Sequence, residues 1–393
     1  MPRQDTTVIH AGEGASDRAR PLTAPIYQTS TFVFDSTADL EEYVAGGSGR
    51  YLYSRYANPS VESAEAKLAA LEGAEAAMVT ASGMAATATA LFGLLAAGDE
   101  LVASAAIYGG SIHLMTGFLR KFGVTVRLVP MGGDLLAHIG PATKVVWFES
   151  PTNPTLRCLD IRHLAAGCRE RGITSVCDNT FASPINQQPL ALGVDLVMHS
   201  ATKYLNGHSD VVAGALAGPA ALIDRLQPAR RFLGGVLDPS AAYALARGMK
   251  TIAVRVARQN ESAQRLAEWL AADPRVRTVA YPGLPSHPDH AIARRQMSGF
   301  GGMVTCAVHG GLAAARDVFD RVRLIQRAVS LGGVETICSL PVLTSHYGVS
   351  AADLAAAGVT DDMIRISVGL EDPADLMADL DQALGRGPAG AAS

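Results

Sequence analysis

Short apolar runs rich in β-branched residues alternate with helical stretches between Val61 and about Gly218, and this alternation restricts the possible folds most strongly. The runs are A-A-M-V-T, E-L-V-A-S, V-T-V-R-L-V, K-V-V-W-F-E, T-S-V-C-D and D-L-V-M-H. Strands that alternate with helices are joined by right-handed crossovers, which give a mostly parallel sheet with helices on both faces. The sequence therefore predicts an α/β fold whose ligands bind beyond the carboxyl ends of the strands.

The chain has 393 residues, which is more than one ordinary hydrophobic core contains, so we expect more than one structural unit. Residues 1–60 have many turn formers and little helical periodicity, which is typical of an extended arm. Residues 61–250 contain the alternating runs and form the predicted ligand-binding domain. A long helical pattern from about Ala241 to Ala272 leads into residues 251–393, where G-G-M-V-T-C-A-V, V-F-D-R-V and I-R-I-S-V-G predict a smaller α+β domain. The last residues, G-R-G-P-A-G-A-A-S, are typical of a disordered tail.

The charge balance gives no reason to expect a nucleic-acid or membrane partner, because the net charge is −4 and the pI is about 6.2. Only 18% of the residues are charged and 48% are hydrophobic, so we expect further surface to be buried in a homo-oligomer. The uncharged run from Ala76 to Gly98 is interrupted by threonine, serine and glycine, which favours buried core over a membrane span. A small molecule is the expected partner.

The cysteine pattern predicts reduced thiols. The five cysteines, at positions 158, 168, 177, 306 and 338, are an odd number without a C-x-x-C spacing. Such a pattern favours neither a disulfide framework nor a metal site. The first residues, M-P-R-Q-D-T-T-V-I-H, lack the apolar segment of a secretory signal. We therefore expect a cytoplasmic protein.

Two charged residues follow predicted strands at the edge where a ligand is expected. Lys203 comes after D-L-V-M-H, directly behind Ser200 and Thr202. Asp178 ends the run T-S-V-C-D. Each alone has an ordinary explanation, a solvated loop lysine or an aspartate that caps a helix or forms a turn. Together they match the needs of pyridoxal phosphate: an amine for its aldehyde, an anion for its pyridine nitrogen, and hydroxyl donors for its phosphate.

Three further segments point to the same site. Gly83 and Met84, in A-S-G-M-A-A, follow one strand and open a helix whose N–H groups can bind an anion, although a plain tight turn is the alternative. Tyr108 follows another strand and can place its ring on a cofactor or simply pack in the interior. Arg365 lies inside the apolar run I-R-I-S-V-G, so it needs an anionic partner, either a substrate carboxylate or an internal ion pair.

These motifs resemble one known family along nearly the whole chain. The matching segments are I-H-A-G, P-I-Y-Q-T-S-T-F, Y-S-R-Y-A-N-P-S, A-S-G-M-A-A, Y-G-G-S, E-S-P-T-N-P, C-D-N-T-F, H-S-A-T-K-Y, S-L-G-G-V-E-T and I-R-I-S-V-G-L-E-D. The family is that of the pyridoxal-phosphate enzymes of cysteine and methionine metabolism, which includes cystathionine gamma-synthase, cystathionine gamma-lyase, methionine gamma-lyase and the related sulfhydrylases. The resemblance implies fold type I of these enzymes, the aspartate aminotransferase-like fold, with a large cofactor-binding domain and a smaller C-terminal domain.

The resemblance also implies a role for each candidate residue. Lys203 is similar to the lysine that holds the cofactor aldehyde and acts as a base, and Asp178 to the partner of the pyridine nitrogen. Residues that would hold the phosphate are Ser200, Thr202, Gly83 and Met84, together with Tyr53 and Arg55 from the neighbouring subunit, so the smallest active unit would be a dimer, and a tetramer is common in the family. Tyr108 would stack on the cofactor and carry a proton. Asn153 would contact either the ring hydroxyl of the cofactor or the substrate carboxylate, and Ser330 and Arg365 would position the substrate.

The resemblance leaves the substrate open. Members that act on cystathionine tend to have an acidic residue before the tyrosine of Y-S-R, where this chain has Leu52. A leucine favours a short apolar thioether such as methionine, because an unpaired ammonium group buried beside it would be costly. Methionine gamma-lyases typically carry a cysteine after Tyr-Gly, where this chain has Gly110, the form more usual in the cystathionine enzymes. We expect gamma-elimination from methionine, with cystathionine gamma-lyase, cystathionine gamma-synthase and O-acylhomoserine sulfhydrylase as alternatives.

Two other classes of protein fit the α/β pattern less well. A dinucleotide-dependent oxidoreductase needs G-x-G-x-x-G between a strand and a helix, which A-S-G-M-A-A does not provide. A binding or scaffolding protein could keep the fold without chemistry. The joint presence of Lys203, Asp178, Tyr108 and Arg365 argues against that reading.

Overall fold

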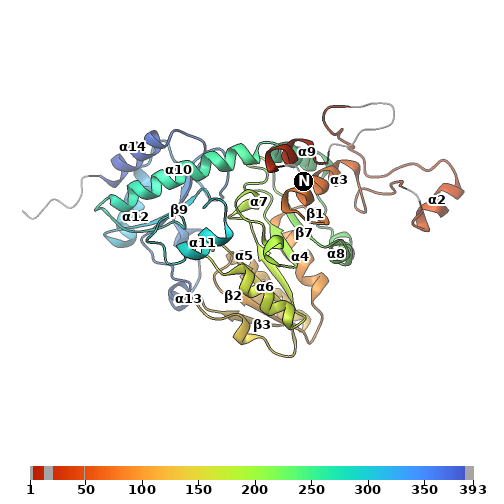
Figure 1. The fold of residues 1–393 in the computed structure, drawn as a ribbon, viewed down its shortest axis with the longest axis horizontal. Coiled ribbons are helices and arrows are strands. Elements are labelled where there is room, and N and C mark those ends of the chain that lie inside the picture. Colours follow the sequence, from red (N-terminus) through yellow and green to blue (C-terminus); the bar gives the residue numbers. More distant parts are fainter. Residues whose placement is uncertain (1–2, 13–20, 48, 386–393) are drawn as a thin grey trace, which may run out of the picture.

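The computed structural model describes residues 3–12, 21–47 and 49–385 and contains two β-sheets (Figure 1). The larger sheet has seven strands in the order β1-β7-β6-β5-β4-β2-β3, and the smaller has five in the order β10-β11-β12-β9-β8. All strands of the first sheet precede residue 250 and all strands of the second follow it. The exact domain boundaries at residues 60 and 250 stay predictions.

The seven-stranded sheet is mostly parallel, and the predicted α/β fold class is confirmed. The six predicted runs form β1 (Ala76–Thr80), β2 (Glu100–Ser104), β3 (Thr125–Val129), β4 (Thr143–Glu149), β5 (Thr174–Asp178) and β6 (Leu196–His199). Sequence reasoning missed β7 (Gly214–Gly218), which pairs antiparallel with both β1 and β6. Its sequence, G-A-L-A-G, has too few β-branched residues to predict a strand.

Helices cover both faces of this sheet. They are α3 (Pro59–Glu72), α4 (Gly83–Leu94), α6 (Ile161–Glu170), α8 (Ala220–Leu233) and α9 (Pro239–Met249). Ala77 and Val79 on β1 pack in one core with α3 and α9, whereas Met78 between them packs in the other core with α4 and α8. Successive strand residues point to opposite faces, so a strand buried on both sides reads as a continuous apolar run.

The five-stranded sheet forms the C-terminal half. Its strands are β8 (Val276–Ala280), β9 (Met303–Val308), β10 (Gln326–Arg327), β11 (Ile337–Ser339) and β12 (Met363–Ser367). The helices of this half are α10 (Ile252–Ala272), α11 (His290–Gln296), α12 (Gly311–Arg321), α13 (Ala351–Ala356) and α14 (Pro373–Leu384). The run V-F-D-R-V forms the last turn of helix α12 and its C-cap, Val322, which fits the predicted α+β composition. Figure 1 shows α10 extending from α9 toward α12 and α14, so it links the two halves.

The helical pattern predicted from Ala241 to Ala272 is two helices rather than one. The break falls between α9 and α10, where the carbonyl oxygen of Gly248 accepts hydrogen bonds from the side chains of Thr251 and Arg255, at 3.2 and 2.9 Å. These two side chains hold the junction between the helices in place.

The N-terminal arm is less extended than predicted, because it includes α1 (Gln4–His10) and α2 (Thr37–Val44). Helix α1 packs against α3, and α2 lies at the far end of the arm (Figure 1). Short segments of the larger half are α5 (Gly109–His113), η1 (Leu114–Phe118), η2 (Leu119–Phe122), η3 (Leu136–His138), α7 (Ser183–Asn186) and η4 (Pro189–Leu192), and η5 (Pro341–Leu343) belongs to the C-terminal half. Most of the predicted tail, from residue 386 on, lies outside the described residues.

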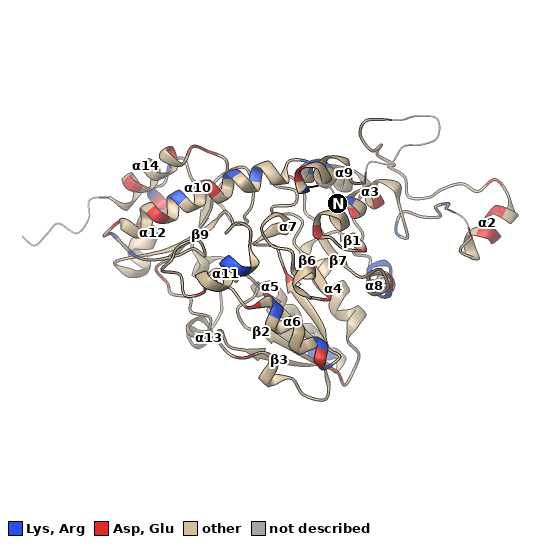
Figure 2. Ribbon diagram, in the orientation of Figure 1, with Lys and Arg blue, Asp and Glu red and all other residues tan. Residues whose placement is uncertain are grey.

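Charged residues lie mainly on the outer helices. Figure 2 shows both red and blue along α10 and α12 and red alone on α14, whereas the sheets are mostly tan. Among the described residues, no helix is both long and apolar enough to cross a membrane. The five cysteines are free and buried, and burial raises the pKa of each thiol.

Candidate active site

A cavity of about 560 Å³ opens beyond the carboxyl ends of β1, β4, β5 and β6. The sheet order places these strand ends next to one another or one strand apart, so residues distant in sequence meet there. Ten of the predicted site residues line this cavity: Gly83, Met84, Tyr108, Asn153, Asp178, Ser200, Thr202, Lys203, Ser330 and Arg365. Both halves of the chain contribute, since Ser330 and Arg365 come from the C-terminal half.

Lys203 lies in the turn after β6 and its amine faces Ser330. Its Nζ donates a hydrogen bond of 2.6 Å to the Ser330 hydroxyl. Burial, followed by the nearby positive charge of Arg365, lowers the pKa of Lys203 to about 8. A lysine with this pKa keeps part of its population as the free amine near neutral pH, which is the form that attacks an aldehyde.

Asp178 is the last residue of β5 and is buried at the base of the cavity. Burial raises the pKa of its carboxyl group, while hydrogen bonds from Thr180 and the charge of His199 lower it. The Thr180 main-chain N–H donates to Oδ1 of Asp178 at 3.0 Å, and the His199 ring is held by Glu72, with Nε2 and Oε1 2.5 Å apart. These neighbours favour the ionised form that a partner of a pyridine nitrogen requires.

One end of the cavity is suited to an anion. Helix α4 begins at Gly83, so the N–H groups of its first turn have no helical acceptor. Gly83 lies against Ser200, and a Cβ added to it would be 2.9 Å from the Ser200 Cβ. Only glycine allows the strand-to-helix turn to approach this hydroxyl so closely. Thr202 completes this wall, and its hydroxyl is fixed by hydrogen bonds of 3.1 and 2.9 Å with the main chain of Ala213.

The opposite side of the cavity carries a cation for a carboxylate. Arg365, on β12, donates to the Asn153 side-chain oxygen at 2.9 Å and to the Ser330 carbonyl at 3.2 Å. Burial lowers the pKa of Arg365 to about 10, so the guanidinium stays charged at neutral pH. Ser330 has a backbone φ of 103°, which is rare for a residue other than glycine and commonly marks a functional position.

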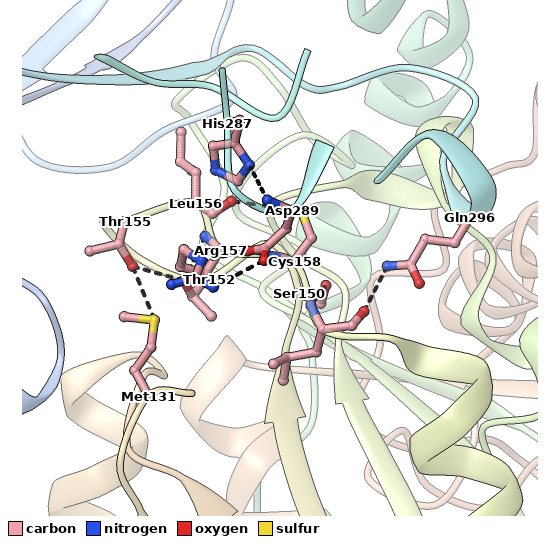
Figure 3. A network of polar contacts seen from close by, with 11 residues as sticks. Met131, Ser150, Thr152, Thr155, Leu156, Arg157, Cys158, His287, Asp289 and Gln296 are labelled. Carbon is pink, nitrogen blue, oxygen red and sulfur yellow. Dashed lines mark hydrogen bonds and ion pairs between the residues drawn. The ribbon is translucent and has the colours of Figure 1, made fainter. Parts of the chain in front are cut away.

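The loop that carries Asn153 is tied to the C-terminal half by polar contacts (Figure 3). Arg157 pairs with Asp289 through two hydrogen bonds, of 2.5 and 3.0 Å, and the main-chain N–H of Cys158 donates to the same carboxylate. The Thr305 hydroxyl donates to the carbonyl oxygen of Pro154 at 2.7 Å. The position of Asn153 therefore depends on both halves of the chain.

Tyr108 is the N-cap residue just before α5, and about half of its surface faces solvent at the cavity wall. Its main-chain N–H donates to the Glu149 carboxyl group at 2.9 Å. The ring lies over Gly110, where an added Cβ would be 2.5 Å from Tyr108 Cε1. The observed orientation of the Tyr108 ring therefore requires a glycine at position 110.

Three predicted residues lie outside the cavity of their own chain: Leu52, Tyr53 and Arg55. Arg55 donates to the carbonyl oxygen of Arg231 at 3.2 Å, and its guanidinium lies 5.7 Å from the centre of the Tyr53 ring. Tyr53 is exposed. A contact between these residues and a cofactor thus requires a second chain.

Sequence reasoning missed several residues that line the cavity. They are Thr87, Ser111, Glu149, Thr180, Phe181, Met198, Val212, Val329, Leu331, Leu343, Thr344 and Ser345. Glu149 had a signal, because it ends the run K-V-V-W-F-E just as Asp178 ends T-S-V-C-D. Val212, Val329 and Leu343 had none, since exposed apolar loop residues reach the cavity only through the tertiary fold.

The residues present fit pyridoxal phosphate. The cavity has the size usual for small-molecule sites, about 300–1,000 Å³. It combines an amine of lowered pKa, a buried carboxylate, and a helix N-terminus with hydroxyl groups beside it. An aldehyde, a pyridine nitrogen and a phosphate require these same three kinds of group.

Comparisons with known proteins agree with this fit. The sequence matches the family described as "Cys/Met metabolism PLP-dependent enzyme" over residues 5–385. It is 42% identical to L-methionine gamma-lyase of Pseudomonas putida, with 98% of each chain covered, and 43% identical to cystathionine gamma-synthase of Mycobacterium tuberculosis, with 97% of this chain and 96% of the relative covered. The crystal structure of cystathionine gamma-lyase from Lactobacillus plantarum complexed with L-serine superposes with a TM-score of 0.91 at 35% identity, covering 97% of this chain and 98% of that one.

Proposed function

Because the chain belongs to the Cys/Met metabolism PLP-dependent enzyme family, and so is an enzyme that uses pyridoxal phosphate, we propose that it catalyses gamma-elimination from L-methionine. The reaction consumes water and yields methanethiol, 2-oxobutanoate and ammonia. The family, the fold and the cofactor agree with the predictions from sequence. The residue roles below are part of the proposal.

Lys203 supplies the base. When bound, the cofactor provides an aldehyde for the substrate amine and a protonated ring that takes up the electrons left by the departing α proton. Lys203, with its pKa lowered to about 8, holds the cofactor at rest and removes the α proton of the substrate once displaced. Ser330 holds the amine in place through the 2.6 Å hydrogen bond, and Asp178 would supply the carboxylate for the ring nitrogen.

Arg365 orients the substrate. Its guanidinium is buried and charged, and Asn153 lies 2.9 Å from it. A substrate carboxylate bound by Arg365 brings the α carbon toward Lys203, since Ser330 contacts both residues. Gly83, Met84, Ser200 and Thr202 hold the phosphate at the other end of the cavity.

Tyr108 protonates the sulfur that leaves the γ carbon. It lines the cavity and about half of its surface is exposed, so its hydroxyl can reach a substrate side chain. General acid catalysis contributes about 10²–10⁴ in rate, and Tyr108→Phe should lose a factor in this range. Near-normal gamma-elimination by Tyr108→Phe would remove Tyr108 from proton transfer.

The observation that carries the choice of methionine is the apolar rim of the cavity. The rim consists of Val212, Val329 and Leu343, which line the cavity and are 65%, 65% and 42% exposed. Of the residues that line the described cavity, only Glu149 and Asp178 are acidic, and both are buried at strand ends. A short thioether buries its methyl group against this rim, whereas the distal ammonium of cystathionine would find no carboxylate there.

One observation favours the alternative activities, cystathionine gamma-lyase or gamma-synthase. The close contact between Gly110 and the Tyr108 ring excludes the cysteine that methionine gamma-lyases typically carry at this position, unless the ring moves. The chain is 42% identical to a relative named L-methionine gamma-lyase and 43% identical to one named cystathionine gamma-synthase, so sequence identity favours neither activity. O-acylhomoserine sulfhydrylase is the third alternative.

The proposed active unit is at least a dimer and, by analogy with the family, a tetramer. Tyr53 and Arg55 lie outside their own cavity, and in the proposed assembly they reach the phosphate end of a neighbouring one. A cytoplasmic location is part of the same proposal and rests on the sequence. Size-exclusion chromatography with light scattering tests the assembly, and a monomer that retains full activity would contradict it.

Substrate competition tests the reaction. The purified holoenzyme is incubated separately with methionine, with cystathionine, and with an O-acyl homoserine plus a thiol, and the thiol, keto acid and thioether products are quantified. We expect methionine to give methanethiol and 2-oxobutanoate in equal amounts and with the highest kcat/KM. Faster consumption of cystathionine would contradict the interpretation of Leu52 and of the apolar rim.

A further inference from the structure

Glu149 is a buried carboxyl group at the cavity to which the proposed reaction gives no role. It is the last residue of β4, its side chain is 2% exposed, and it lines the cavity. In the sheet it pairs with Asp178 on the neighbouring parallel strand, so the two side chains point to the same face. Burying a second carboxyl group beside Asp178 costs free energy, which hydrogen bonds to that group must compensate.

The partners of Glu149 are residues that bind or orient the substrate. Its Oε2 accepts the hydrogen bond from the main-chain N–H of Tyr108 at 2.9 Å, at the N-cap of α5. The main-chain N–H of Asn153 and the charge of Arg365 also act on the carboxyl group. Glu149 thus lies between the three residues that form one wall of the cavity.

Glu149 and Asp178 both have a pKa raised by burial, and the pKa of Glu149 has an additional cause. Burial first, and then the negative charge of Asp178, raise the pKa of Glu149 well above its usual value, against the opposing effects of Tyr108, Arg365 and Asn153. Two adjacent buried carboxyl groups are not readily both ionised. Glu149 therefore favours the protonated form, which still accepts a hydrogen bond through its carbonyl oxygen and adds no charge beside Asp178.

We propose that Glu149 is a positioning residue that fixes the main chain of Tyr108, and with it the hydroxyl that protonates the leaving group. The inference rests on the proposed function, because it assumes that Tyr108 donates this proton. The hydrogen bond anchors the N-cap residue of α5, so its loss allows the tyrosine to shift along the cavity wall. A shift of about 1 Å in a reacting group can cost a hundredfold in rate.

The test compares two substitutions that separate hydrogen bonding from charge. Glu149→Gln keeps an acceptor oxygen and a neutral side chain, and we expect kcat to stay within about threefold of the parent value. Glu149→Leu removes the acceptor at similar volume, and we expect kcat to fall about tenfold to a hundredfold with a smaller change in KM. The visible circular dichroism of the bound cofactor provides a second readout, which should change in Glu149→Leu while cofactor content stays stoichiometric.

A double-substitution cycle with Tyr108→Phe separates positioning from a general structural role. If Glu149 acts through the Tyr108 hydroxyl, Glu149→Leu should cause little further loss of kcat once that hydroxyl is absent. Independent, multiplying losses would overturn the inference. So would parent-like kcat in Glu149→Leu, or a loss in Glu149→Gln as large as in Glu149→Leu.

A matched control comes from the C-terminal half. Asp379 is also a buried carboxylate, and it accepts main-chain hydrogen bonds from Arg323, Leu324 and Ile325. Asp379→Asn should lower thermal stability and leave kcat and the dichroism of the cofactor unchanged. If Tyr108→Phe is impaired but Glu149→Leu is not, the inference fails and the proposed function stands; if the parent enzyme performs no gamma-elimination, the proposed function itself fails.

Discussion

Carboxyl side chains at the two ends of the seven-stranded sheet have different surroundings. At the amino end, Glu100 accepts hydrogen bonds from Arg127 at 3.0 Å and from the Thr143 hydroxyl at 2.6 Å. At the same end, Asp195 accepts both the main-chain N–H and the hydroxyl of Ser175, at 2.8 and 2.7 Å. These carboxylates are matched with donors from neighbouring strands.

At the carboxyl end the carboxyl groups face a cavity instead. Asp178 and Glu149 are both buried there, and burial is the largest cause of the raised pKa of each. Lys203 at the same end has a pKa lowered by burial. Carboxylates at the amino end of the sheet are thus paired with side-chain donors and stabilise the fold. Those at the carboxyl end line a cavity, where a ligand can interact with them.

The sharpest test of the comparison substitutes one aspartate at each end. Asp178→Asn should reduce kcat/KM about a hundredfold to a thousandfold, because the protonated ring nitrogen of the cofactor would lose its buried counter-charge, worth about 3–5 kcal/mol. Asp195→Asn, at the amino end, should leave kcat/KM within about twofold. Steady-state kinetics on cofactor-loaded variants measures both. Equal losses at the two ends would break the comparison.

Arginines at the two ends provide the next test. Arg365→Gln should raise KM and lower kcat/KM about tenfold to a hundredfold, since a charged hydrogen bond to a substrate carboxylate contributes about 1.5–3 kcal/mol. Arg127→Gln removes the partner of Glu100 at the amino end and should leave the kinetics unchanged. A parent-like KM in Arg365→Gln would show that another group binds the carboxylate.

Thr143→Val, at the amino end of the sheet, should lower the free energy of unfolding without changing catalysis. The substitution leaves the buried Glu100 carboxylate and the Gly140 N–H without the hydroxyl that joins them. We expect a loss of about 1–3 kcal/mol in the free energy of unfolding, measured by urea denaturation of the cofactor-free protein. The kcat at a temperature where the variant is folded should equal that of the parent, and a reduced kcat would mean that the amino end also influences the site.

The smallest expected effect concerns substrate choice. Leu52→Asp places a carboxylate where the cystathionine enzymes of the family tend to have one, and should raise the ratio of kcat/KM for cystathionine over methionine about fivefold. An exposed ion pair contributes only about 0.2–1 kcal/mol, which limits the gain. Leu40→Asp on the exposed arm helix α2 is the matched control. An unchanged ratio in Leu52→Asp would indicate that Leu52 does not face the substrate in the assembly.

Local sequence predicted the inner parallel strands β2, β4, β5 and β6 because nearly all of their residues are buried, so each reads as an apolar run. It also predicted Asp178, a carboxylate that ends such a run, and Lys203, a lysine that follows one within a few residues. Glu149 ends the run K-V-V-W-F-E in the same way, so the sequence carried a signal for it as well. For these residues the local sequence was enough to predict a place in the site.

Other features depend on contacts that no local pattern reveals. Strand β7 consists of small residues that form a strand because β1 and β6 lie on either side of it. The junction between α9 and α10 is held in place by the side chain of Arg255, which reaches the Gly248 carbonyl. The apolar rim joins Val212 to Val329 and Leu343, which lie more than a hundred residues further along the chain.

The central claim is that the cavity at the carboxyl end holds pyridoxal phosphate through Lys203. Borohydride reduction of the holoprotein, followed by peptide mass spectrometry, tests it most directly, because reduction makes the bond between lysine and cofactor permanent. The account predicts one pyridoxyl group per chain, on Lys203. A label on Lys67, Lys121, Lys144 or Lys250 in its place, or no label on any lysine, would contradict it.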